Sequence, residues 1–207
     1  EIFVFADVPL NAVPSLNRGF SAPVRMKTDL TDENLSFLMA HDSDEFNRFE
    51  ACNVYAKGLL LKMIESGQNF KDDNFLSAWG KILADSQIDD AFKALSLGLP
   101  TIGELLQEQP VHNYEGTKSA LDFLEHTLAT NFENELNVLY SDLNVEEEFS
   151  VDAKSMGKRE LKNTILMYLS NVESKQNLCP TQYDSSTNMT DKLAALRNMV
   201  YYANKAE

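Results

Sequence analysis

Residues 31–52, TDENLSFLMAHDSDEFNRFEAC, mark the point at which the chain changes from irregular to helical. From Thr31 onward, apolar residues recur every three or four positions, which is the period of an amphipathic helix. Thr31 is placed to cap a first helix, DENLSFLMA. Asp42 precedes Ser-Asp-Glu, a spacing in which Asp42 would cap a second helix while Glu45 reaches back to it. The stretch therefore predicts two consecutive helices.

The same stretch gathers a histidine, carboxylates and a cysteine, so a metal site is the alternative interpretation. A metal needs ligands that converge on one side, such as positions i and i+4 of a helix. Asp44, Glu45 and Glu50 do not share one face, and His41 is the only histidine nearby. Capping and the helix dipole explain acidic residues in a first turn, and we favour that interpretation.

Apolar periodicity predicts about eight helices joined mostly by short turns. One of them is a single long helix from about Glu115 to Leu143, and a break at Pro180 precedes a last helix that opens at Thr190. Other starts are expected at Asp72 or Asp73 and at Thr101. We expect the core to contain the apolar stripes of these helices, including Phe46, Phe49, Ala56, Leu60, Met63, Phe75, Leu76, Trp79, Ile82, Leu83, Leu161, Ile165, Leu169 and Val172.

The first 30 residues have a different character. EIFVFADV (1–8) and VRMKTDL (24–30) are predicted as short strands, separated by a segment with three prolines and a glycine. Two strands do not form a stable sheet alone, so residues 1–30 are predicted to be the last strands and linker of a truncated β domain. Residues 31–207 then form a mostly α domain, an α-solenoid of stacked helical hairpins of the armadillo or HEAT kind. No strict repeat is visible, and an irregular bundle is the alternative.

Composition narrows the classes of partner. A formal charge of −14 argues against binding to nucleic acid and against binding to anionic membrane surfaces. Two cysteines are too few for a disulfide framework or a four-cysteine zinc site; Cys52 is expected in a helix as a buried hydrophobe and Cys179 in a loop before Pro180. No apolar run is long enough to span a membrane, and no signal peptide is recognisable. We expect a cytoplasmic protein.

Motifs that carry chemistry are missing from the sequence. His112 and His126 are isolated, and no H-E-x-x-H, G-x-G-x-x-G, Walker or G-x-S-x-G pattern occurs. We therefore predict no catalytic, cofactor-binding or metal-binding residue in these 207 positions.

Three longer segments carry a resemblance: VPSLNRGFSAPVRM (13–26), FLMAHDSDEFNRFEA (37–51) and TNMTDKLAALRNMV (187–200). Together and in this order, they resemble the bacterial aminopeptidase N family of zinc metallopeptidases. The resemblance runs through nearly the whole chain and is weakest between about Gly67 and Val111.

The resemblance implies that residues 1–30 end a β-sandwich domain and that residues 31–207 begin the C-terminal helical domain of an enzyme that removes N-terminal amino acids from peptides. In that family, H-E-x-x-H and a downstream glutamate bind zinc, and a G-x-M-E-N segment captures the substrate's amino group. Neither motif occurs here, so no site residue is carried over and no zinc is expected on this chain alone. The implied role is non-catalytic: to enclose an active site on the catalytic domain of the same chain and limit the access of peptide substrates. A stand-alone α-solenoid interaction module is the alternative.

Overall fold

The structure, a computed structural model, describes residues 4–24, 26–145 and 147–203. Within these residues, every regular element is helical. The helices are α1 (Asp32–His41), α2 (Glu45–Ser66), α3 (Asp73–Ala84), α4 (Asp90–Leu97), α5 (Ile102–Gln107), α6 (Tyr114–Asn131), α7 (Glu133–Leu143), α8 (Ala153–Leu169), α9 (Leu178–Ser185) and α10 (Met189–Ala203), with short 3₁₀ turns η1 (Arg18–Phe20) and η2 (Glu173–Lys175).

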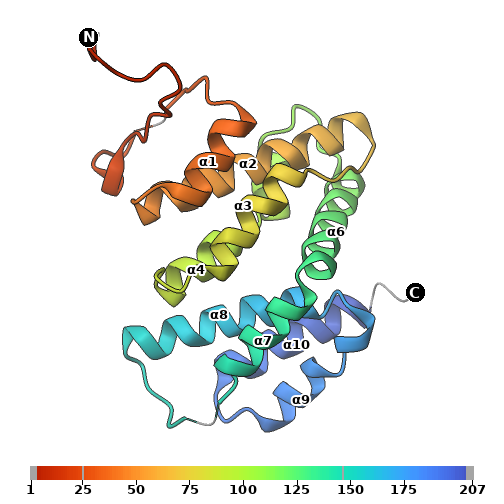
Figure 1. Ribbon diagram of the computed structural model, residues 1–207. Helices are drawn as coiled ribbons and strands as arrows, with labels where there is room; N and C mark the ends of the chain where they lie inside the picture. Colours follow the sequence, from red (N-terminus) through yellow and green to blue (C-terminus); the bar gives the residue numbers. More distant parts are fainter. Residues whose placement is uncertain (1–3, 25, 146, 204–207) are drawn as a thin grey trace.

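Two groups of helices make up the molecule. Figure 1 shows α1 to α4 in one group and α7 to α10 in the other, with α6 running from the first group to the second. Helix α1 packs on α2 and α3, α7 and α10 pack on α8, and α9 packs on α10. The contact between α4 and α8 joins the two groups across a long stretch of sequence. The predicted mostly helical fold is confirmed.

Side-chain caps place the helix starts. Thr31 accepts from the amide of Asn34, whose side chain accepts from the Thr31 amide in return. Asp72 and Thr101 cap α3 and α5 as predicted. The predicted cap of α2 is wrong by two residues: Asp44 caps it by accepting from the Asn47 amide at 3.0 Å, whereas Asp42 follows the end of α1.

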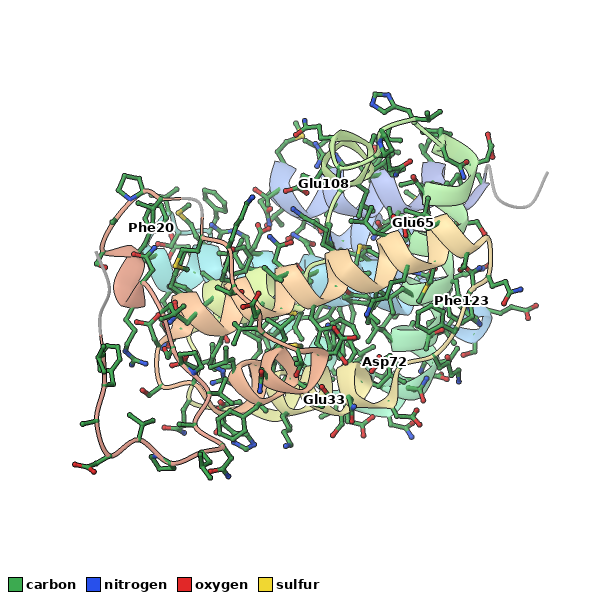
Figure 2. The ribbon with its side chains drawn as sticks, turned by 90° about the horizontal axis from the view of Figure 1, so that it is seen from above. Phe20, Glu33, Glu65, Asp72, Glu108 and Phe123 are labelled. Carbon is green, nitrogen blue, oxygen red and sulfur yellow. The ribbon has the colours of Figure 1, made fainter. Side chains whose placement is uncertain are left out.

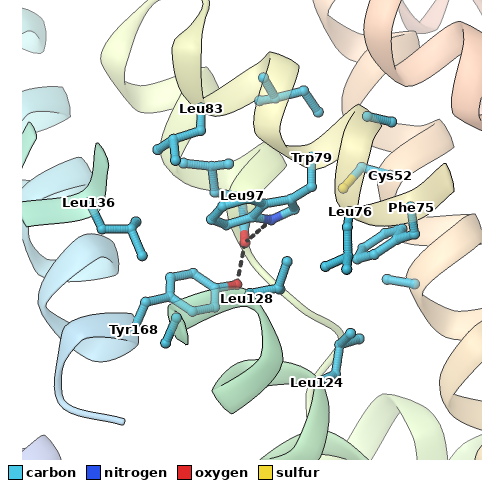
Figure 3. Close-up of a cluster of buried hydrophobic side chains, with 14 of the residues drawn as sticks. Cys52, Phe75, Leu76, Trp79, Leu83, Leu97, Leu124, Leu128, Leu136 and Tyr168 are labelled. Atoms are coloured by element: carbon cyan, nitrogen blue, oxygen red, sulfur yellow. Dashed lines mark hydrogen bonds between the residues drawn. The ribbon is translucent and has the colours of Figure 1, made fainter. Parts of the chain in front are cut away.

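The core is continuous through both groups of helices. Trp79 and Leu60 are fully buried, as predicted. Figure 3 shows how the groups meet: the indole Nε1 of Trp79 and the hydroxyl of Tyr168 both donate to the carbonyl of Leu97, at 3.3 and 2.5 Å. The prediction for Phe49 is wrong, because this side chain is only partly buried. It lies near the start of α2, where its ring faces Phe46 at a centroid distance of 6.4 Å.

The predicted long helix from Glu115 to Leu143 is wrong, because it is two helices. Phe132, with φ −120° and ψ 24°, separates α6 from α7. Its ring packs on Trp79 at 5.2 Å and covers Gly80 so closely that a Cβ there would lie 2.6 Å from Phe132 Cε1. The break is thus set by a tertiary contact rather than by a proline or glycine in the helix itself.

Two further predictions are corrected near the C-terminus. Cys179 lies in α9 and is buried, and Pro180 lies in the first turn of that helix, where the amide that proline lacks would have no helical partner. Helix α10 begins at Met189 rather than opening at Thr190, and Asn188 accepts from the amide of Asp191.

The predicted strands are also wrong where the structure describes them. Residues 4–8, 24 and 26–30 form no strand, while residues 1–3 and 25 lie outside the described part. Residues 4–12 are exposed, and a strand needs a neighbour to accept its hydrogen bonds.

Candidate functional site

The most organised polar region joins the N-terminal segment to the start of α2. Here the chain makes a tight turn in which Asn17, Gly19 and Phe20 have φ values of 51°, 62° and 50°. Asn17 fixes the turn by accepting from the amide of Ala22 and donating to its carbonyl, both at 3.0 Å. Positive φ suits glycine and asparagine but is unfavourable for phenylalanine, so surrounding contacts must hold Phe20 in place.

Arg18, at the tip of this turn, contacts the connection between α1 and α2. Its Nη1 lies 2.8 Å from Asp42 Oδ1, and its Nη2 donates to the hydroxyl of Ser43 at 2.8 Å. The Asp42 side chain is 2% exposed, whereas that of Arg18 is 48% exposed. The pair therefore has one partner in the protein interior and one at the surface.

Asp44 and Asn47 complete the attachment from the first turn of α2. Asp44 Oδ2 accepts from the amide of Gly19 at 2.8 Å while Oδ1 caps the helix. Asn47 Nδ2 donates to Ser15 Oγ at 2.8 Å and to the carbonyl of Leu16 at 2.9 Å. We call residues 15–20 together with residues 42–47 the junction. It ties the segment before α1 to the start of α2.

The electrostatics of the junction favour a charged Asp42. Burial would raise the pKa of this carboxyl, but hydrogen bonds from Ser15, from the Asp44 amide and from Arg18 lower it overall below its ordinary value. The contacts of Arg18, Gly19 and Asn47 join the N-terminal segment to the start of α2, so the junction is suited to positioning that segment.

An aromatic group begins within the junction and extends along α2. Phe20 and Phe46 have ring centroids 5.0 Å apart, Phe46 and Phe49 follow along α2, and Phe20 is 53% exposed. Figure 2 shows Phe20 near one end of α2 and Glu65 near the other.

The sequence analysis singled out Asp42 and Asp44 but neither Arg18 nor Asn47. The only signal for Arg18 in the sequence is its place in the Asn-Arg-Gly turn.

A second polar region lies in the other group of helices, under a cleft of about 690 Å³. At its floor, Lys162 Nζ lies 2.6 Å from Asp191 Oδ2, and both side chains are at least 90% buried. Asn163 and Asn188 also donate to the Asp191 carboxylate, at 3.0 and 2.9 Å. Burial would raise the pKa of Asp191, but Lys162 and the two amides lower it overall. The ion pair is thus fully hydrogen-bonded at its acidic end.

The three histidines lie in different parts of the chain. His41 lies at the end of α1, 3.3 Å from Lys81 Nζ, and His126 Nδ1 lies 3.2 Å from the carbonyl of Asn171. His112 is exposed. Among the described residues, no group of three or more histidine, cysteine, aspartate or glutamate side chains is arranged to hold a metal ion.

The thiols offer no accessible nucleophile in the described part of the chain. Both cysteines are free and buried, as predicted for Cys52. Burial raises the pKa of the Cys52 thiol to about 12, and the pKa of Cys179 is raised for the same reason.

No helix in the described residues is long and apolar enough to cross a membrane.

Comparison with known proteins identifies relatives along most of the chain. The profile of a family described as a domain of unknown function with ARM repeats (DUF3458_C) matches residues 32–207. The aminopeptidases N of Caulobacter vibrioides and Escherichia coli are each 32% identical to the chain, over 93% and 95% of its length. The crystal structure of Legionella pneumophila aminopeptidase A in complex with aspartic acid matches 89% of the chain with a TM-score of 0.77 and 26% identity. The chain spans 23% of the length of each of these relatives.

Proposed function

The chain belongs to the DUF3458_C family of ARM-repeat domains and is homologous to the C-terminal region of aminopeptidase N, and on that premise we propose that it is the non-catalytic helical part of a zinc-dependent aminopeptidase. The intact enzyme would remove N-terminal amino acids from peptides. The observation that carries this proposal is the 32% identity to two aminopeptidases N over at least 93% of the chain.

The proposed role of these residues is to enclose the active site and limit which substrates reach it. Residues 31–207 would form part of a helical wall over the catalytic domain, and residues 1–30 would be the end of the preceding domain and its linker. The junction supports this division, because Arg18 ties that linker to the connection between α1 and α2, and Gly19 and Asn47 tie it to the start of α2. A wall of this kind admits short peptides, excludes folded proteins and removes water from the site.

The zinc ion of such an enzyme does not fit the residues described here. A catalytic zinc site needs three protein ligands and an open position, and among the described residues no three histidine, cysteine, aspartate or glutamate side chains are gathered to provide them. We therefore assign the metal, the general base and the amino-group site to the preceding part of the polypeptide. These residues would support that site by shape alone. We also place the enzyme in the cytoplasm, which agrees with the two free thiols.

The proposal is tested by comparing the 207-residue chain with the full-length polypeptide. We expect the full-length protein to contain one equivalent of zinc after dialysis and to hydrolyse aminoacyl-anilides. The 207-residue chain should do neither. Stoichiometric zinc with turnover in the short chain, or no turnover in a full-length protein loaded with zinc, would overturn the proposal.

A further inference from the structure

The cleft above the Lys162–Asp191 pair has the size of a small-molecule site and a polar lining. Its volume of about 690 Å³ lies within the roughly 300–1,000 Å³ of most ligand pockets. Of the described residues that line it, only Leu143, Val145 and Phe149 are apolar. A lipid or another apolar molecule does not suit such a lining, because polar groups would lose water without gaining hydrogen bonds. The cleft is suited to a small, polar ligand.

One wall of the cleft is a basic face of α8. Lys158, Arg159 and Lys162 all line the cleft, and their spacing brings them to one side of the helix. Two of the three cations are already paired: Lys162 with the buried Asp191, and Lys158 with Glu147 at 2.7 Å. The third, Arg159, is the residue of this wall that can best receive an anionic group.

Arg159 is held in place without losing its charge. Its Nη2 donates to the carbonyl of Ser150 at 2.8 Å, and its guanidinium lies over the ring of Phe149 at 4.8 Å from the centroid. Within the part of the chain that the structure describes, Arg159 forms no ion pair with a carboxylate. A guanidinium has five N–H donors, so its remaining donors can bind a carboxylate through two parallel hydrogen bonds.

Another wall, from the end of α9 and the segment after it, offers hydrogen-bond acceptors. The hydroxyls of Ser185 and Ser186 donate to the carbonyls of Thr181 and Gln182, at 2.9 and 2.6 Å. Because a hydroxyl has a single proton to donate, these two oxygens can only accept further hydrogen bonds. Glu148 adds an exposed carboxylate to the lining. These groups suit a ligand that donates, such as an ammonium group.

We propose that this cleft binds a free amino acid with an uncharged polar side chain. The carboxylate of the ligand pairs with Arg159, and its ammonium group donates to the serine oxygens and to Glu148. A ligand with only negative charge would be repelled by Glu147 and Glu148, and one with only positive charge by Arg159. A molecule that carries both charges satisfies both walls, and a polar side chain suits the rest of the lining. The inference rests on the cleft alone and does not need the proposed function.

Isothermal titration calorimetry on the 207-residue chain tests the ligand class, with L-glutamine as the probe. N-acetyl-L-glutamine lacks the ammonium charge, L-glutamine amide lacks the carboxylate, and L-leucine has an apolar side chain of similar size. We expect L-glutamine to bind with a dissociation constant of about 1 mM or below. Each of the other three compounds should bind at least about tenfold more weakly, because each loses a charged hydrogen bond or places methyl groups against polar ones.

Two variants of α8 test the assigned residue. Arg159→Gln should weaken the binding of L-glutamine about tenfold or more, because the carboxylate loses its cation. Lys154→Gln is the matched control, since Lys154 is an exposed cation of the same helix outside the lining of the cleft. It should change the affinity by less than about twofold. Circular dichroism shows whether both variants are folded, and the ligand series on the unchanged chain decides the matter if Arg159→Gln is not.

Several results would overturn the proposal. They are no binding of L-glutamine at about 10 mM, equal binding of L-glutamine and any of its three analogues, and unchanged affinity in a folded Arg159→Gln variant. Inorganic phosphate that binds at least as tightly as L-glutamine would show a simple anion site instead. None of these measurements depends on peptidase activity, so the proposed function stands or falls separately.

Discussion

Two aspartate ion pairs, one in each group of helices, have the same chemistry in different surroundings. Arg18 and Asp42 lie 2.8 Å apart at the junction, where the Arg18 side chain is 48% exposed. Lys162 and Asp191 lie 2.6 Å apart under the polar cleft, where both side chains are at least 90% buried. Distance alone would rank the two pairs as nearly equal.

Burial separates them. At the junction, water solvates Arg18 but reaches only 2% of the Asp42 side chain, so losing the arginine leaves a buried carboxylate that keeps the hydrogen bond from the Asp44 amide, at an intermediate cost. Under the cleft, removing one partner leaves a charge without solvent, which is costly even though the intact pair need not stabilise the fold. The pair at the junction therefore holds the N-terminal segment against the connection between α1 and α2. The buried pair couples the stability of α8 to that of α10.

The largest effect is expected from breaking the buried pair. Lys162→Met should lower the free energy of unfolding by about 3–5 kcal/mol, because Asp191 stays buried without its cation. Urea denaturation followed by circular dichroism measures the change. Lys158→Met is the matched control one turn earlier in α8: its pair with Glu147 is exposed, so the loss should stay below about 1 kcal/mol.

The double variant Lys162→Met with Asp191→Asn removes both charges. It should regain part of the stability lost in Lys162→Met alone, since no uncompensated charge remains. Equal losses in Lys162→Met and Lys158→Met would mean that burial does not distinguish these lysines.

A smaller effect is expected from the apolar side chains beside the junction. Phe49→Ala should cost about 1–2 kcal/mol, because its ring is only partly removed from water. Trp79→Ala, at a fully buried site, should cost about 3–5 kcal/mol. Thermal denaturation of the two variants gives the comparison, and a loss at Phe49 as large as that at Trp79 would show that the junction is packed like the core.

The half-exposed ion pair at the junction should matter less than the buried one. Arg18→Gln is expected to cost about 1–2 kcal/mol, because the 2% exposed Asp42 loses its cation but keeps the hydrogen bond from the Asp44 amide at 2.9 Å. Added salt should reduce the difference between wild type and variant, as it screens an exposed charge. Urea denaturation measures the loss. A loss of roughly 3–5 kcal/mol, the value expected for breaking a fully buried pair, would show that Arg18 stabilises the fold as much as Lys162 does.

The smallest effect is a change in acid sensitivity. The folded-state pKa of Asp42 is lowered, so its contribution is present above the unfolded pKa of about 3.9 and is lost as the pH falls through the folded value. Arg18→Gln removes one group that lowers this pKa and so reduces the contribution. The stability difference between wild type and Arg18→Gln should therefore be full near neutral pH and shrink below about pH 4. Urea denaturation at several pH values tests this, and a difference that grows on acidification would contradict it.

Local sequence signals predicted the helices well where the cap and the period agree. Thr31, Asp72 and Thr101 carry their own hydrogen-bonding partners within three residues, so the start of each helix is encoded locally. Two aspartates two residues apart both suit a cap before α2, and Asp44 takes that place while Arg18 and the Asp44 amide engage Asp42. The choice between the two carboxylates depends on a contact 24 residues away.

Features that depend on distant parts of the chain could not be predicted in this way. The division of α6 from α7 follows from the packing of Phe132 on Trp79 and Gly80, which no local pattern contains. The strands predicted for residues 1–30 rest on β-branched composition, but a strand forms only where a partner strand accepts its hydrogen bonds. At the candidate site, the absence of catalytic motifs was readable from the sequence, whereas the attachment of Asn47 to Ser15 and Leu16 was not.

The shared acceptor at Leu97 gives the protein a built-in optical reporter. Trp79 is the only tryptophan in the chain, and its indole and the Tyr168 hydroxyl donate to the same carbonyl. Its fluorescence therefore reports whether α3, α4 and α8 are together. The aromatic group at the junction consists of Phe20, Phe46 and Phe49, which are nearly silent under the same excitation. Opening of the junction would pass unseen by tryptophan emission, while separation of the two groups of helices would change it at once.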